Sequence, residues 1–249
     1  KIVYILLFFI YFADVSYSRD FLLGDISNRN ISITASFTGA NIIIYGAIDP
    51  NIYVHNNIYI TVIGPKKTLR LRKKINKFGF WLLDKEFVDI YDMPSYYALA
   101  SNINDSDMKE PVFIVNEIGW ENIKFKPINK ISDEEKKIKL DILKKIYISE
   151  KLYVPKLNGI NIIRNTLFRS EFELPATAQV GNYEVYMYLV SKESHELISI
   201  WSDNITVTKE GLSADLFDYS KNQPLLYGLF AALGAIVFGF IASEVFRRI

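Results

Sequence analysis

Residues 31–47 read Ile-Ser-Ile-Thr-Ala-Ser-Phe-Thr-Gly-Ala-Asn-Ile-Ile-Ile-Tyr-Gly-Ala, and this stretch decides the fold class. Its first part, Ile31–Phe37, alternates apolar residues with small or polar ones, which is the period of a half-buried β-strand. Its second part, Ile42–Ala47, is continuously apolar, as expected of a strand that is buried on both faces. The stretch therefore predicts two strands of a β-rich domain.

Similar short apolar segments follow on the C-terminal side of this stretch, and Gly64-Pro65 marks one of the turns between them. We expect further strands at residues 58–63, 69–72, 80–83, 87–91, 167–174, 183–190, 197–201 and 204–208. Short β-prone segments with regular turns predict a mainly β fold that forms one or more immunoglobulin-like sandwiches. The strands after residue 157 form either a smaller sheet of their own or the second sheet of one sandwich.

One segment in the middle of the chain has a helical period instead. Ser132-Asp-Glu-Glu135 fits a capping box, in which the Ser132 oxygen accepts a hydrogen bond from the Glu135 amide. The apolar residues that follow recur every four positions and comprise Ile138, Ile142 and Ile146, with Leu143 beside them. The pattern predicts an amphipathic helix from about Asp133 to Lys151 that covers one side of the sandwich.

The two ends of the chain are apolar in different ways. Residues 2–13 form an uncharged run of twelve that follows Lys1 and precedes Ser16-Tyr-Ser18. Twelve helical residues reach roughly 18 Å, which is short of the roughly 30 Å hydrocarbon core of a bilayer. A basic start, a short apolar core and small residues at the end predict a signal peptide that is cleaved after Ser18. The alternative is a retained N-terminal anchor.

The C-terminal apolar run is long enough to cross a membrane. Residues 225–242 are eighteen positions without a charge, and Arg247 and Arg248 follow them. Basic residues flank membrane helices on the cytoplasmic side. We therefore expect a single-pass protein of the inner (cytoplasmic) membrane, with most of the chain in the periplasm and the C-terminus in the cytoplasm.

Composition restricts the possible functions. Half of the 249 residues (50%) are hydrophobic, so the chain is too apolar to be disordered, and its net charge of +1 gives no support to a nucleic-acid-binding role. Cysteine is absent, which excludes disulfides, thiol catalysis and zinc–thiolate sites. The two histidines, His55 and His195, stand in segments typical of exposed loops. Because the common catalytic and phosphate-binding motifs are also missing, we expect no enzyme, no metal site and no cofactor.

Two features of the soluble part are candidates for binding. Residues 66–77 contain no acid, and a strand there would place its arginines on one face, opposite Leu69 and Leu71. This basic strand could bind an anion or face anionic lipid through Arg70, Arg72, Lys73, Lys74 and Lys77. The alternative is a charged edge hairpin that prevents edge-to-edge pairing. Tyr91, Tyr96 and Tyr97 form the second feature, which is either a recognition surface or a turn that closes the core.

The third candidate lies within the C-terminal apolar run. Ala231, Ala235, Gly239 and Ser243 are spaced four residues apart. On a helix they share one face, and small residues at this spacing allow two membrane helices to approach closely. We expect this face to contact a multi-pass membrane protein or a second copy of the chain.

Segments spread along the whole chain resemble a family of transmembrane proteins from alphaproteobacteria (Alph_Pro_TM). The matching segments are Ser36–Ala40, Ile44–Ala47, Met93–Ser101, Asn165–Arg169 with Leu174-Pro175, Gly181–Val185, and Pro224–Gly228 leading to Phe246–Arg248. They occur in order from about Leu23 to Arg248. The resemblance implies a signal peptide, an exported region and a C-terminal anchor, and it implies a sulfite-exporter-like permease of the TauE/SafE type as the partner.

These observations lead to one expected organisation and one preferred function. The expected segments are a signal peptide (1–18), a first β-rich domain (19–107), a connecting segment with the amphipathic helix (108–156), a second β-rich region (157–210), a juxtamembrane linker (211–223), the transmembrane helix (224–243) and a cytoplasmic tail (244–249). The preferred function is a non-enzymatic accessory or binding subunit of a membrane complex. The alternatives are an extracytoplasmic enzyme with an unrecognised carboxylate site and an envelope-assembly module.

Overall fold

The structure is a computed structural model that describes most of the chain after the N-terminal segment. The described residues are 21–77, 79–104, 108–124, 126–127, 133–211, 216 and 219–248. The expected signal peptide (1–18) and the expected helix cap at Ser132 lie outside this described part.

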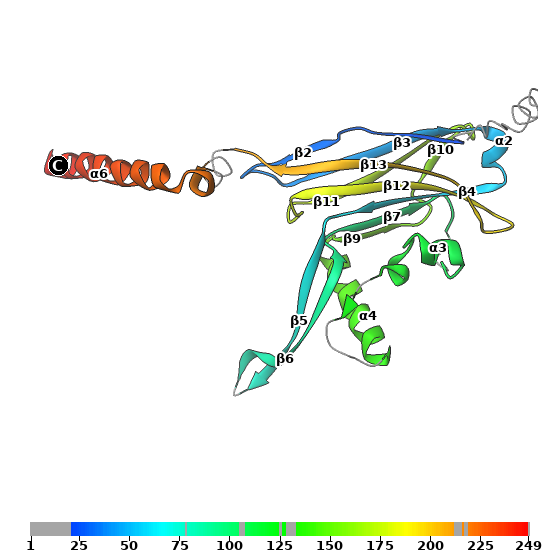
Figure 1. The fold of residues 1–249 in the computed structure, drawn as a ribbon, viewed down its shortest axis with the longest axis horizontal. Helices are drawn as coiled ribbons and strands as arrows, with labels where there is room; N and C mark the ends of the chain where they lie inside the picture. The colour runs from blue at the N-terminus through cyan, green and yellow to red at the C-terminus, as the bar shows by residue number, and fades with distance from the viewer. Residues whose placement is uncertain are drawn as a thin grey trace, which may run out of the picture.

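The main body is a sandwich of two β-sheets (Figure 1). The four-stranded sheet has the order β1 (Leu22–Ile26), β3 (Gly39–Ile48), β11 (Leu167–Pro175) and β10 (Asn161–Ile163). The six-stranded sheet has the order β2 (Asn30–Ile33), β13 (Leu197–Lys209), β12 (Gly181–Ser191), β4 (Asn56–Ile63), β7 (Tyr97–Ser101) and β9 (Tyr153–Lys156). In both sheets, strands from before residue 64 pair with strands from after residue 157. Residues 157–210 therefore form neither a sheet of their own nor the complete second sheet of the sandwich, the two arrangements that the sequence had suggested.

The strand order is that of an immunoglobulin-like sandwich. One sheet of that fold contains strands A, B, E and D, and the other contains G, F, C and C′. Here β1-β3-β11-β10 faces β13-β12-β4-β7 in the same order, and β2 crosses over to pair in parallel with β13. The Tyr183 hydroxyl near the start of β12 donates to the Gln179 carbonyl at 2.8 Å, which is the tyrosine corner of this fold. The expected mainly β, immunoglobulin-like class is confirmed.

The crossing of the first strand between the sheets is held by ion pairs on the surface. Arg29, in the connection between β1 and β2, donates to Asp25 at 2.6 Å and to Asp203 at 2.8 Å. Hydrogen bonds from the Ile26 amide and from Tyr45, together with Arg29, lower the pKa of Asp25.

The strand expected over Ile31–Phe37 ends at Ile33 in the structure. The chain turns there, and the Phe37 amide donates to the Thr34 carbonyl at 3.1 Å.

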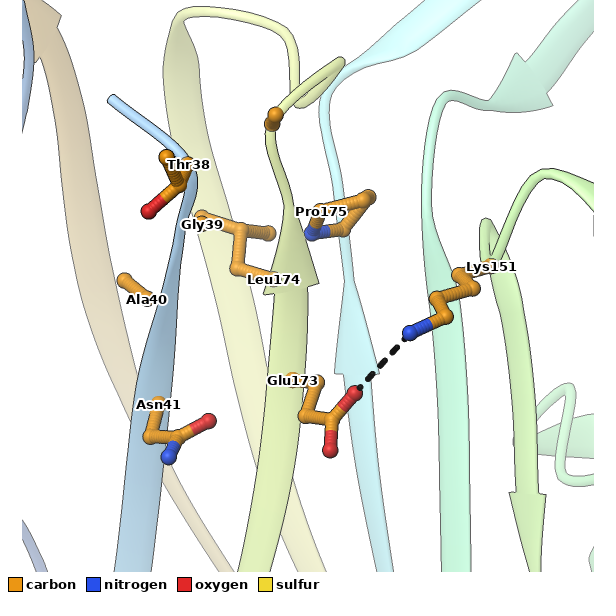
Figure 2. Close-up of a pocket in the computed structure, with 9 residues that line it drawn as sticks. Thr38, Gly39, Ala40, Asn41, Lys151, Glu173, Leu174 and Pro175 are labelled. Atoms are coloured by element: carbon orange, nitrogen blue, oxygen red, sulfur yellow. Dashed lines mark ion pairs between the residues drawn. The ribbon is translucent and has the colours of Figure 1, made fainter. Parts of the chain in front are cut away.

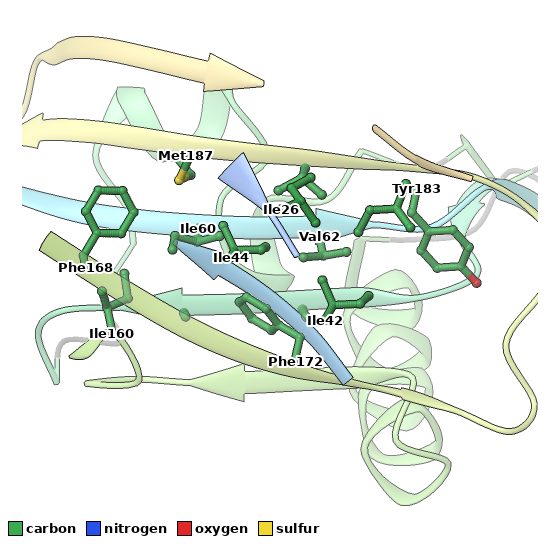
Figure 3. Close-up of a cluster of buried hydrophobic side chains, with 14 of the residues drawn as sticks. Ile26, Ile42, Ile44, Ile60, Val62, Ile160, Phe168, Phe172, Tyr183 and Met187 are labelled. Atoms are coloured by element: carbon green, nitrogen blue, oxygen red, sulfur yellow. The ribbon is translucent and has the colours of Figure 1, made fainter. Parts of the chain in front are cut away.

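Apolar side chains from both sheets fill the sandwich (Figure 3). Ile42, Ile44, Phe168 and Phe172 point inward from the four-stranded sheet, and all are at most 2% exposed. They meet the inward side chains of the six-stranded sheet, which include Ile60, Val62, Tyr183 and Met187. The alternation expected along residues 167–174 is confirmed, since the even-numbered positions are buried and the odd-numbered ones are exposed.

The two sheets differ in what covers their outer faces. The six-stranded sheet is covered by α3 (Pro111–Val115), the 3₁₀ turn η1 (Trp120–Asn122) and α4 (Asp133–Ser149), which build a second core with Tyr59, Tyr97 and Tyr188. Ile58–Val62 of β4 is therefore buried on both faces. Among the described residues no helix covers the outer face of β3 in this way, and Tyr45 there is 41% exposed. The expectation that Ile42–Ala47 is buried on both faces is wrong for this reason.

The helix α4 confirms the predicted insert but presents a different face to the sheet. Leu143 and Tyr147 are each 2% exposed and pack against the second core, and the Tyr147 hydroxyl donates to the Pro94 carbonyl at 2.9 Å. Ile138, Ile142 and Ile146, the residues expected to be buried, are 59%, 48% and 38% exposed. The helix is rotated toward the tyrosine because Tyr147 stacks edge-on against Trp120, with the ring centres 5.2 Å apart.

Three further elements extend from the sandwich. A long hairpin of β5 (Lys66–Lys77) and β6 (Phe80–Pro94) carries the short strand β8 (Lys126–Pro127) beside β6. The short helix α2 (Pro50–Tyr53) lies at the opposite end of the sandwich from the C-terminal helix α6 (Pro224–Arg248) (Figure 1). The expected apolar C-terminal helix is confirmed by α6.

The orientation of α4 makes a stability prediction. Leu143→Ala should lower the free energy of unfolding by about 2–5 kcal/mol, because it opens a cavity in the second core. Ile142→Ala, one position away on the exposed face, should change it by less than about 1 kcal/mol. Urea unfolding of the detergent-solubilised protein, followed by tryptophan fluorescence, measures both. A larger loss for Ile142→Ala would show that the isoleucine face is the buried one.

Candidate functional site

The candidate sites concentrate on the β5–β6 hairpin, whose base is fixed to the sandwich. Leu69 and Leu71 of β5 pack against the second core, and Ile90 and Met93 of β6 are 2% and 0% exposed. The leucines and the arginines of β5 lie on opposite faces, as the sequence predicted. The hairpin therefore leaves the sandwich as an arm with a buried root.

The arginines of the basic strand have different surroundings. Arg70 donates to both carboxylate oxygens of Asp89 at 2.6 and 2.7 Å, and its guanidinium lies 4.4 Å from the centre of the Phe87 ring. Hydrogen bonding from Arg70 lowers the pKa of Asp89 and keeps this carboxylate charged. Arg70 thus joins β5 to β6, whereas Arg72 is exposed and its guanidinium lies over the Phe87 ring, 5.4 Å from the ring centre.

The remaining basic candidates are placed by their backbone. Lys73, Lys74 and Lys77 lie on β5 beyond Arg72, toward the turn of the hairpin, and their side chains are outside the described part of the structure. Among the described strands β5 lies at the edge of its three-stranded sheet, which agrees with the edge-protection alternative. Anion binding and edge protection are compatible, because both require exposed cations on an edge strand.

The end of the hairpin is a feature that sequence reasoning missed. Phe80, Trp81 and Leu82 are 72%, 71% and 50% exposed. Gly79 adopts φ +82°, and its amide donates to the Asn76 side chain at 3.1 Å, so this glycine makes the turn that displays the three residues. Residues 80–83 were expected to form a strand of the sandwich. The sequence signal for this exposed end was the apolar run of residues 80–82 directly after the turn glycine Gly79.

A shallow hollow lies where β3 and β11 pair at one end of the sandwich (Figure 2). Its volume is about 300 Å³, and its lining comprises Thr38, Gly39, Ala40, Asn41, Lys151, Glu173, Leu174, Pro175 and Ala176. Two of the segments that carry the family resemblance meet here, since Gly39 lies opposite Pro175. Lys151 and Glu173 pair at 3.5 Å on the rim, with side chains 71% and 63% exposed. Such a solvated pair contributes little to stability and offers polar groups to a solute or a partner.

The other residues singled out from the sequence are placed as structural or exposed groups. Tyr96 and Tyr97 are fully buried, and their hydroxyls donate to the Glu173 and Glu117 carbonyls at 3.0 Å each. They close the core, as one of the two interpretations predicted, and only Tyr91 of the three is exposed. His55 and His195 are exposed in loops. Among the described residues no group of three or more His, Asp or Glu side chains is arranged to hold a metal.

The small-residue face of α6 is open. Ala231, Ala235, Gly239 and Ser243 are all exposed, and no neighbouring atom of the described chain lies within 4 Å of a Cβ built at Gly239. The most apolar stretch of 18 residues in α6 has a mean hydropathy of 2.3, and none of it is buried inside the protein. Among the described helices it is the one that is long and apolar enough to cross a membrane.

The Arg70–Asp89 pair makes a pH prediction. Asp89 has a folded pKa below its ordinary value of 3.8, so the pair stabilises the fold above that pH and loses its effect as the pH falls through the folded pKa. Asp89→Asn should therefore lower the Tm at pH 6, and the difference from wild type should shrink toward pH 3. Thermal unfolding across this range measures it, with Asp141→Asn on the exposed surface of α4 as the control. A difference that stays constant from pH 6 to pH 3 would contradict the role of the pair.

Comparisons with known proteins place the chain in a family. The profile of the family described as "Putative transmembrane protein (Alph_Pro_TM)" matches residues 22–248. No curated protein matches the sequence. Among solved structures, a family 123 glycoside hydrolase from Clostridium perfringens that hydrolyses glycolipid glycans is similar over 77% of this chain and 28% of its own, with 13% identity and a TM-score of 0.26. A likeness this weak carries no argument about fold or function. The family match covers nearly the whole described chain, and this protein therefore belongs to the Alph_Pro_TM family of transmembrane proteins.

Proposed function

We propose that this protein is a non-enzymatic accessory subunit of a membrane complex. The observation that carries the proposal is the contrast between its two parts. The sandwich closes its own core, whereas α6 has a long apolar surface of which none is buried by the rest of the chain. A lone membrane helix without a polar stripe can serve as a tether, as a packing element, or as both.

In this proposal the sandwich lies in the periplasm and α6 crosses the inner membrane. Arg247 and Arg248 follow the apolar part of α6, and basic residues favour the cytoplasmic side. Glu244 pairs with Arg247 at 2.9 Å, so the charged end of the helix is a compact polar group suited to a headgroup layer. The sandwich would then meet partners or solutes outside the cytoplasm.

The proposed partner is a multi-pass membrane protein, with a TauE/SafE-type permease as the candidate that the family resemblance implies. Lipid tails are as apolar as the helix, so association within the bilayer depends on close packing rather than on hydrophobicity. The open face of Ala231, Ala235, Gly239 and Ser243 allows such packing. The polar rim of the hollow beside Gly39 would contact the partner or an anionic solute.

The orientation can be tested with single cysteines, because the natural chain has none. Ser194→Cys, in an exposed loop of the sandwich, should react with a membrane-impermeant maleimide added to intact spheroplasts. Phe246→Cys, which is 79% exposed at the end of α6, should react only after the membrane is permeabilised. Gel-shift labelling measures both. The reverse pattern, or labelling of both sites in intact spheroplasts, would contradict the proposed topology.

The packing role of α6 predicts a difference between two conservative substitutions. Gly239→Ile adds bulk to the small face and keeps the helix apolar, so the protein should insert normally but recover its membrane partner severalfold less well. Ile236→Leu lies off that face and is the matched control. The measurement is pull-down of the full chain from mild detergent, with membrane insertion checked in parallel. Equal recovery of the same companions by both variants would remove the support for a packing anchor, and recovery of none by the wild type would favour the enzymatic or envelope-assembly alternatives.

A further inference from the structure

We propose that the β5–β6 hairpin is a second membrane contact. Phe80, Trp81 and Leu82 at its end would enter the interfacial layer of the bilayer that α6 crosses, on the side where the sandwich lies. The cations of β5 would lie over anionic lipid headgroups. This inference rests on the anchoring of α6 and is separate from the identity of any protein partner.

The end of the hairpin is apolar and exposed. Among the described residues outside α6, Phe80 and Trp81 are the two most exposed large apolar side chains, at 72% and 71%, and Leu82 beside them is 50% exposed. Contiguous exposed apolar groups of this size mark a surface that is covered in the working protein. Aromatic residues beside leucine are the composition of segments that lie at the membrane–water interface.

The hairpin is an arm with a fixed base and a free end. Leu69, Leu71, Ile90 and Met93 hold its base in the second core. The last six of the 12 residues of β5 lie beyond Leu71, and six strand residues span roughly 20 Å at about 3.3 Å per residue. The Arg70–Asp89 pair joins the two strands midway. The arm can therefore hold its apolar end well clear of the sandwich.

The hairpin is positively charged near its apolar end. From Lys66 to Leu83 the chain contains seven cations and no acid, and the cations nearest the apolar end are Lys73, Lys74 and Lys77. Asp89 neutralises Arg70, and the part of the hairpin beyond this pair keeps an excess of positive charge, with two acids (Asp84 and Glu86) and five cations (Arg72, Lys73, Lys74, Lys77 and Lys85). Lysines next to an apolar segment are attracted to anionic lipid when the segment reaches the interface.

The hairpin leaves the sandwich at the end from which the chain continues to α6. Ile63, three residues before β5, lies opposite Glu184, and Gly181 lies opposite Val207, two residues before the end of β13. A Cβ built at Gly181 would lie 3.0 Å from the Pro65 ring, so the start of the hairpin and the start of β12 are in close contact. The hairpin and the linker to α6 therefore depart from the same end of the sandwich. In Figure 1 the hairpin slants toward the side on which α6 lies.

The test uses the full chain in vesicles that contain no other protein. Leu82→Cys at the hairpin end, Ser194→Cys in the loop between β12 and β13 at the opposite end of the sandwich, and Phe240→Cys within α6 are each labelled with an environment-sensitive fluorophore. The vesicles contain phosphatidylglycerol and phosphatidylcholine, with or without nitroxide-labelled lipid. We expect quenching and a blue shift at position 82, deeper quenching at position 240 and none at position 194. Replacing Lys73, Lys74 and Lys77 with Gln should reduce the quenching at position 82 at least twofold at low salt.

The outcomes separate this inference from the proposed function. Quenching at position 240 together with an unquenched position 82 would overturn the second membrane contact and leave the anchor intact; it would indicate that the hairpin end meets a protein. An unquenched position 240 would instead overturn the anchor on which both proposals rest. Quenching at position 82 that is the same in purely zwitterionic vesicles would overturn the role of the cations.

Discussion

The pairing of β3 with β11 and of β4 with β12 is the constraint on which the rest of the structure depends. Each pair joins a strand from the first part of the chain to one that follows the whole insertion of hairpin and helices. Neither part can close the core alone, because Ile42 and Ile44 need Phe168 and Phe172 beside them and Tyr183 and Met187 opposite. Long-range pairing costs loop-closure entropy, and the dense apolar core offsets this cost. The Tyr183 corner and the Arg29 ion pairs then fix the edges of a body that is already closed.

This closure gives the insertion a defined place. The β5–β6 hairpin follows β4 and the helices α3 and α4 follow β7, so both insertions are fixed to the six-stranded sheet and build a second core on its outer face. The four-stranded sheet keeps an uncovered outer face. The hairpin, the hollow beside Gly39 and the linker to α6 all lie at the same end of the sandwich. An anchored protein holds this end nearest the membrane. The proposed contacts with lipid and with a partner follow from this shared location.

The hydrophobic periodicity predicted whether a segment is a strand or a helix better than it predicted what packs against each face of that element. The alternation along residues 167–174, the helix near Asp133 and the apolar C-terminal helix could all be predicted, because each pattern is a local property of the chain. The outer face of β3, the buried face of α4 and the exposed end of the hairpin could not, because each depends on which distant segment lies alongside. Tyr147 shows the difference: its large ring and its hydrogen bond to Pro94 decide the rotation of α4, although three isoleucines mark another face. For the basic strand, the sequence predicted that the arginines and the leucines lie on opposite faces. The ion pair between Arg70 and Asp89 could not be predicted, because it depends on the register in which β5 pairs with β6.

The central claim is that one interleaved sandwich, rather than two β-rich domains in series, carries the exposed hairpin and the membrane helix. Amide hydrogen exchange of the full chain in detergent, resolved by peptide and followed by mass spectrometry, tests it directly. The account predicts that β3, β4, β11 and β12 are the slowest-exchanging segments and open together, with the same dependence on added denaturant. Opening of residues 167–190 at a denaturant concentration where residues 39–63 stay protected would contradict it, because strands that share a core and a ladder cannot open separately.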